Sequence, residues 1–277
     1  METATGVMST LTENYEKLGK YMDNWRWEVG KTPLSEDIYP YSTSVTYLLV
    51  IFLLVKFMKN RKPMQLKGFS IVHNLNLILL SGSMLIGVLE AAYRQSQSQG
   101  TFSLFCEQSP NAVQGRIGFW IYIFYLSKYV ELIDTVILAL KKRSIIFLHV
   151  FHHMIMVPLT HLWLKEQWLS GSWWCTFVNS FIHVIMYYYY LQTTLGNQCW
   201  FKKYITTSQI VQFLTGTVVV TYWLIIRKSY NCQGGLIPGV VSNLINTSFI
   251  LLFSKFYIDS YLKGRSSTPS SSKSKSE

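Results

Sequence analysis

The chain has 277 residues, of which 49% are apolar, 16% aromatic and only 14% charged. Soluble domains carry about 25% charged residues and disordered chains are poor in aromatic residues, so the composition excludes both classes. Lysines and arginines (25) outnumber acidic residues (14), but the apolar runs are too long for a soluble nucleic-acid-binding domain. The composition therefore predicts an all-α integral membrane protein with no nucleic-acid partner.

Seven hydrophobic segments follow a polar N-terminal segment (residues 1–41), and each approaches the roughly 20 apolar residues that a helix needs to cross a bilayer. No cleavable signal peptide precedes the first of them, which we expect to act as an uncleaved signal anchor. A buried helical core of a soluble protein is the alternative, but soluble helices need a polar face that most of these segments lack. We therefore expect a seven-helix transmembrane domain over residues 42–262, formed by Ser42–Met58, Phe69–Tyr93, Ile117–Leu140, Ile145–Leu164, Ser172–Leu191, Tyr204–Ile226 and Leu236–Leu262.

Lysine and arginine residues concentrate in alternate loops between these segments and in the C-terminal tail. The positive-inside rule places those loops and the tail in the cytosol, so with seven spans the N-terminus is lumenal. The tail (residues 263–277) is rich in serine and lysine and is expected to be disordered. Its residues Lys273 and Lys275 resemble a dilysine-type endoplasmic reticulum retrieval signal.

Two of the four cysteines, Cys106 and Cys232, fall in loops on the predicted lumenal side. The lumen of the secretory pathway permits disulfides, whereas the cytosol keeps thiols reduced. We therefore expect a Cys106–Cys232 disulfide, with four independent thiols as the alternative.

Polar side chains recur inside five of the apolar segments, where they are costly and are candidates for function. In the second segment, His73 lies near the predicted cytosolic end, and a structural histidine is the alternative there. The third segment contains the run SKYVELIDT, in which Lys128 and Glu131 can pair on one helical face. An ion pair that only fixes helix packing is the alternative for this run. The sixth segment contains two glutamines three residues apart, which could serve interhelical hydrogen bonding instead of a site. The candidates in these two segments are Lys128, Glu131, Asp134, Thr135, Gln209 and Gln212.

Histidines mark the fourth and fifth segments. His149, His152 and His153 share one helical face near the predicted cytosolic end, and three imidazoles on a buried face are difficult to explain by packing alone. In the fifth segment, Asn179 and His183 continue into a stripe with Met186, Tyr187 and Tyr190. Because all these groups lie at a similar depth, we expect a buried polar chamber beneath a basic rim formed by Lys141, Lys142, Arg143, Lys202 and Lys203.

Three chemistries compete for this chamber. A membrane di-iron desaturase or hydroxylase would need several histidine clusters, and the chain has one cluster and six histidines in all. A seven-span transporter or receptor with a histidine proton relay would be expected to show broken, Gly/Pro-interrupted helices, which are not evident. The third chemistry uses imidazole as a nucleophile and base on an anionic carrier substrate such as a coenzyme A thioester.

The runs KYVELIDT, HVFHH, NSFIHVIMYYYY and ITTSQIVQF resemble, in order and spacing, the four signature regions of the ELO-type very-long-chain fatty acid elongases. The resemblance implies an endoplasmic reticulum enzyme with seven spans, six of which surround an acyl tunnel closed at its lumenal end. It implies condensation of a long-chain acyl-CoA with malonyl-CoA to give 3-oxoacyl-CoA, CO2 and CoA, without a metal or other cofactor. Implied partners are membrane lipid and the ketoreductase, dehydratase and enoyl reductase of the elongation cycle; homo-oligomer formation is left open.

The resemblance also implies roles for particular residues. The catalytic set is His149, His152, His153, His183 and Asn179, and the remaining polar and aromatic candidates would bind substrate. We expect His152 to be the nucleophile, because it is central in its motif and shares a face with His149. His183 would polarise the thioester or assist decarboxylation of malonyl-CoA, and Asn179 would orient it.

Overall fold

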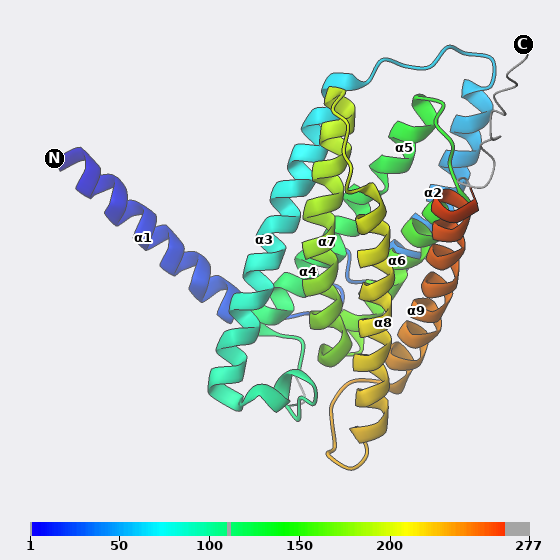
Figure 1. The fold of residues 1–277 in the computed structure, drawn as a ribbon. Coiled ribbons are helices and arrows are strands. Elements are labelled where there is room, and N and C mark those ends of the chain that lie inside the picture. The colour runs from blue at the N-terminus through cyan, green and yellow to red at the C-terminus, as the bar shows by residue number, and fades with distance from the viewer. Residues whose placement is uncertain (1, 110–111, 264–277) are drawn as a thin grey trace, which may run out of the picture.

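The computed structural model describes residues 2–109 and 112–263, and every regular element in these two ranges is helical (Figure 1). Each of the seven hydrophobic segments is helical, which confirms the predicted all-α class. The predicted tail and its Lys273 and Lys275 lie outside the described residues, apart from position 263. The helices are α1 (Glu2–Asp23), α2 (Ile38–Met58), α3 (Lys67–Gln99), η1 (Thr101–Leu104), α4 (Gly115–Glu131), α5 (Ile133–Leu140), α6 (Phe147–Lys165), α7 (Leu169–Leu195), α8 (Lys202–Ile226) and α9 (Leu236–Tyr257), which continues into a π-helical turn (Ile258–Leu262).

Four helices of the described ranges are long and apolar enough to cross a membrane by length and composition alone: α2, α3, α8 and α9 together with its π-helical turn. The other segments fall short of this standard because they are shorter or carry histidine, tyrosine, tryptophan and charged side chains that lower their mean hydropathy. Length and composition therefore support a multi-pass membrane protein.

The third hydrophobic segment, Ile117–Leu140, is divided in the structure, although its sequence predicts one helix. Helix α4 ends at Glu131 and α5 begins at Ile133, and neither proline nor glycine stands at the break. The N–H of Leu132 donates to the carbonyl of Tyr129, three residues earlier, at 3.3 Å, so the chain tightens locally into a 3-10-type turn. The break falls inside the SKYVELIDT run, between its two carboxylates.

Six segments form a closed ring of neighbours. Helix α3 packs along α7, α7 beside α8, α8 beside α9, and α9 beside α6, while α6 and α3 both contact α4. Helix α2 lies outside this ring, where it packs against α5 and α6 (Figure 1). The same arrangement explains why α2 is the least buried of the four long apolar helices.

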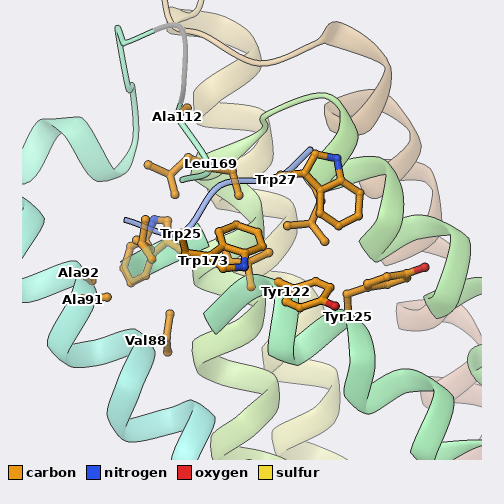
Figure 2. Close-up of a cluster of buried hydrophobic side chains, with 14 of the residues drawn as sticks. Trp25, Trp27, Val88, Ala91, Ala92, Ala112, Tyr122, Tyr125, Leu169 and Trp173 are labelled. Carbon is orange, nitrogen blue, oxygen red and sulfur yellow. The ribbon is translucent and has the colours of Figure 1, made fainter. Parts of the chain in front are cut away.

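The N-terminal region is more structured than a polar lumenal segment would suggest. Helix α1 projects from the side of the bundle (Figure 1), and the segment that follows it, residues 24–37, packs into the helices. We call residues 24–37 the N-terminal strap. Its Trp25 and Trp27 are buried, and Trp25 stacks on Tyr122 of α4 with ring centroids 5.3 Å apart (Figure 2). His161 of α6 lies 2.8 Å from the carbonyl oxygen of Ser35, so the strap is held by polar contacts as well.

Charged pairs fix the two ends of the strap. Arg116 donates to both carboxylate oxygens of Asp23, and these hydrogen bonds hold the pKa of that carboxyl below its usual value. At the other end, Lys165 donates to Asp37, which likewise lowers the pKa of the Asp37 carboxyl. These two pairs anchor a segment whose two tryptophans are already buried.

Cys106, which follows η1, and Cys232, which precedes α9, form a disulfide with Cα atoms 4.8 Å apart. This agrees with the pairing expected from the sequence. The bridge joins residues 126 positions apart and connects the loop after α3 to the loop after α8.

Candidate active site

Glu131, the last residue of α4, lies beside His183 of α7. Lys128 Nζ donates to Glu131 Oε1 at 2.7 Å and to Asn179 Oδ1 at 3.1 Å, and the Ser127 hydroxyl donates to the same carboxylate oxygen at 3.1 Å. His183 Nδ1 lies 3.5 Å from Glu131 Oε1. All of these side chains are buried, so α4 supplies an internal ion pair that contacts the two polar residues of α7.

Asp134, on the other side of the break, belongs to a second network. Its Oδ1 lies 2.7 Å from His73 Nε2 of α3, and its Oδ2 accepts a hydrogen bond from the Tyr187 hydroxyl of α7 at 2.8 Å. One carboxylate thus links α3, α5 and α7. The sequence leaves both a functional and a structural role open for His73, and the structure gives it this partner.

Thr135 connects the second network to the histidine cluster. Its hydroxyl lies 2.9 Å from His149 Nε2 and 2.8 Å from the Tyr47 hydroxyl of α2. The rings of His149 and His153 are 4.3 Å apart between centroids, and those of His152 and His153 are 5.3 Å apart. The three imidazoles therefore form one cluster on α6, as their spacing predicts, and Thr135 contacts the first of them along the helix.

A cavity of about 180 Å³ lies beside this cluster. Helices α5 to α9 all contribute to its wall. Of the predicted site residues, those that line it are Asp134, His149, His152, His153, Asn179, His183, Met186, Tyr187, Tyr190, Gln209 and Gln212. The remaining three, Lys128, Glu131 and Thr135, stand behind the wall and hold residues that line it.

The five residues of the predicted basic rim differ in their surroundings. Lys202 is the rim residue that lines the cavity, whereas Lys203 lies over the ring of Tyr257 at 5.4 Å. Lys141 donates to Ser70 of α3, and Lys142 donates to backbone carbonyls of the loop before α3. Lys141, Lys142 and Arg143 are not among the residues that line the cavity.

Sequence reasoning missed Tyr47, Tyr189 and Tyr261. Tyr189 and Tyr261 line the cavity, and Tyr47 contacts it through Thr135. Tyrosine is common in these apolar segments, so no sequence signal separates these three from packing residues. Within residues 2–109 and 112–263, no three His, Cys, Asp or Glu side chains are grouped so that they could hold a metal ion, which gives no support to the di-iron alternative.

Comparisons with known proteins agree with the motif resemblance. The profile of the ELO: GNS1/SUR4 family matches residues 32–269. Fatty acid elongase sre1 of Dictyostelium discoideum is 70% identical over 242 residues, which cover 87% of this chain and 90% of that protein. Fatty acid elongase A of the same organism is 37% identical over 87% of this chain and 90% of that protein. Very long chain fatty acid elongase 2 of Mus musculus is 33% identical over 79% of this chain and 75% of that protein. The chain therefore belongs to the ELO (GNS1/SUR4) family.

Proposed function

We propose that this protein is a fatty acid elongase that condenses a long-chain acyl-CoA with malonyl-CoA, giving 3-oxoacyl-CoA, CO2 and CoA. The relatives named above are fatty acid elongases. The observation that carries the chemistry is the convergence of His152 from α6 with Asn179 and His183 from α7 on one cavity, with Lys202 also in its wall. Imidazoles suit attack on a thioester, and a lysine suits the phosphates of coenzyme A.

The reaction runs in two steps in this proposal. A neutral His152 imidazole attacks the thioester carbon, the carbon–sulfur bond breaks, and CoA leaves as the thiolate. Malonyl-CoA then loses CO2, and the resulting enolate attacks the acyl carbon, so that the carbon–nitrogen bond breaks and His152 is regenerated. Burial of His153 and partial burial of His149 and His152 limit competing hydrolysis of the acyl-imidazole.

The buried networks act on the histidines in this scheme. Glu131 faces His183 Nδ1, which leaves Nε2 of that ring to polarise the thioester or the malonyl carbonyl. Asn179 accepts a hydrogen bond from Lys128, and in this scheme it orients His183. Thr135 fixes His149, and His149 and His153 hold the orientation of the cluster around the nucleophile.

A smaller cavity of about 20 Å³ supports an acyl site deeper in the ring of helices. It shares Gln212 and Phe213 with the first cavity, and tryptophans of α6 and α7 form part of its wall. We infer that the acyl chain passes Phe213 into this space, within a tunnel that the six-helix ring encloses and that the N-terminal strap closes at its far end. Acyl-CoA, malonyl-CoA and membrane lipid are the expected ligands.

We further propose that all seven segments cross the endoplasmic reticulum membrane, with the N-terminus lumenal and the C-terminus cytosolic. The alternating distribution of basic residues and the disulfide between Cys106 and Cys232 support this orientation. The product would pass to the ketoreductase, dehydratase and enoyl reductase of the same cycle, and these enzymes are the proposed partners.

The function is tested first by supplying purified protein with malonyl-CoA and acyl-CoAs of several chain lengths, and measuring 3-oxoacyl-CoA. The covalent step is tested without malonyl-CoA, where about one equivalent of CoA should be released and the acyl mass should appear on the peptide that carries His152. His152→Ala should abolish both signals, whereas Gln212→Ala should retain some of each. Condensation without an acyl adduct, with CoA release that requires malonyl-CoA, would establish a one-step mechanism and exclude His152 as the nucleophile.

A further inference from the structure

Helix α9 continues into a π-helical turn over Ile258–Leu262. Such turns close their hydrogen bonds over five residues rather than four, are rare, and occur frequently at functional sites. Phe253 and Phe256 of α9 line the large cavity. A regular α-helix would next place Ser260 on this face, four residues after Phe256. The π-helical turn shifts the register by one residue, and Tyr261 lines the cavity instead.

Tyr261 meets Thr206 of α8 at this level of the cavity. Their hydroxyl oxygens are 3.4 Å apart, which exceeds the usual 2.5–3.0 Å for hydrogen bonds between hydroxyl groups. Thr206 is buried and Tyr261 is partly buried, and both line the cavity. Because their mutual contact is long, both hydroxyl groups retain hydrogen-bonding capacity for a molecule in the cavity.

The residues that α8 places along the cavity follow a chemical order. At 1.5 Å per residue, Thr206 lies about 6 Å beyond Lys202 along the helix, and Gln212 lies about 15 Å beyond it. The order is the cation of Lys202, then the neutral hydroxyl of Thr206, then the amides of Gln209 and Gln212, which line the same cavity as the histidines. A coenzyme A thioester has a matching order, because anionic phosphates are joined to the thioester by a neutral pantetheine arm with amide and hydroxyl groups.

We propose that Tyr261 and Thr206 form the binding site for the pantetheine arm, with the Tyr261 hydroxyl donating to an amide carbonyl of that arm. This inference rests on the proposed function and adds two binding residues to it. The π-helical turn has a direct role in this arrangement, since it brings the tyrosine rather than Ser260 into the cavity.

The test compares an acyl-CoA with the corresponding acyl-pantetheine, which lacks the nucleotide and its phosphates. Tyr261→Phe and Thr206→Val should each raise KM about threefold to tenfold for both thioesters, as expected for one lost neutral hydrogen bond, with kcat little changed. Lys202→Ala should raise KM for acyl-CoA alone. Ser260→Ala, at an exposed position on the same turn, should change neither value. Acyl-pantetheine is measured as a substrate or, if it does not turn over, as a competitor of acyl-CoA.

The outcomes distinguish a failure of the pantetheine site from a failure of the proposed elongase function. If wild-type protein forms no 3-oxoacyl-CoA, the proposed function fails. If wild-type protein is active but Tyr261→Phe and Thr206→Val leave KM for both thioesters unchanged, the pantetheine site is wrong and the function stands. An effect of both variants on acyl-CoA alone would assign the two hydroxyl groups to the nucleotide end and would also overturn the proposal. Thermal unfolding of each variant confirms that the comparison is made on folded protein.

Discussion

Removing Lys128 tests whether the buried ion pair is a structural necessity. Lys128→Met keeps the length of the side chain but leaves the Glu131 carboxylate charged in an interior where both groups are only 2% exposed. Breaking one partner of a buried pair typically costs about 3–5 kcal/mol, because the remaining charge is uncompensated. One kcal/mol shifts the melting temperature by about 2–4 °C in domains of 150–250 residues, so we expect a decrease of roughly 6–20 °C.

The assay measures the thermal unfolding of detergent-solubilised protein, and size-exclusion chromatography monitors the loss of folded protein. Lys255→Met is the matched control, since it removes an exposed partner of Asp259 and should leave the melting temperature nearly unchanged. The double variant Lys128→Met/Glu131→Leu removes both charges and should be more stable than Lys128→Met alone. The single variant Glu131→Leu completes the comparison. If the double variant loses as much stability as Lys128→Met and Glu131→Leu added together, the unpaired charge is not what destabilises the protein.

Three further predictions concern the ends of the bundle. Non-reducing digestion should yield a linked peptide pair that contains Cys106 and Cys232, and separate peptides under those conditions would contradict the bridge. The lowered pKa of Asp37 implies that its pairing with Lys165 stabilises the fold above the ordinary aspartate pKa of about 3.9. Wild-type protein should therefore melt above Asp37→Asn at pH 7, and the difference should disappear as the pH falls through the lowered value; a constant difference would exclude this cause. In intact microsomes a C-terminal tag should be accessible to protease and an N-terminal tag protected, whereas equal accessibility would contradict an odd number of spans.

The sequence predicts the helices and most of the site because both depend on local spacing. The three histidines of α6 share a face through helical periodicity, and Glu131 lies one turn from Lys128 for the same reason. Their convergence with Asn179 follows from the shared depth of the polar groups in a membrane. None of these inferences needs the partner of any side chain to be known.

Features that depend on distant partners could not be predicted in this way. The break at Leu132 has no proline or glycine to mark it, and the π-helical turn displaces Tyr261 from the face that regular periodicity gives it. The tryptophans of the strap, Trp25 and Trp27, are separated by Arg26 in a short non-helical run, so their burial against α4 and α6 emerges only from the tertiary structure. Charge alone likewise does not show that Lys142 donates to backbone carbonyls of a neighbouring loop.

The disulfide also restricts how many times the chain can cross the membrane between its two cysteines. Two cysteines can be joined only on one side of a bilayer, so the chain between Cys106 and Cys232 must cross the membrane an even number of times. Of the four helices that qualify as spans by length and composition, α8 is the one that lies between these cysteines, and a single crossing would separate them. An odd number of the three more polar segments must therefore cross as well. If all of α4–α5, α6 and α7 cross, the total is four, and the histidines and carboxylates of the site lie within the thickness of the membrane.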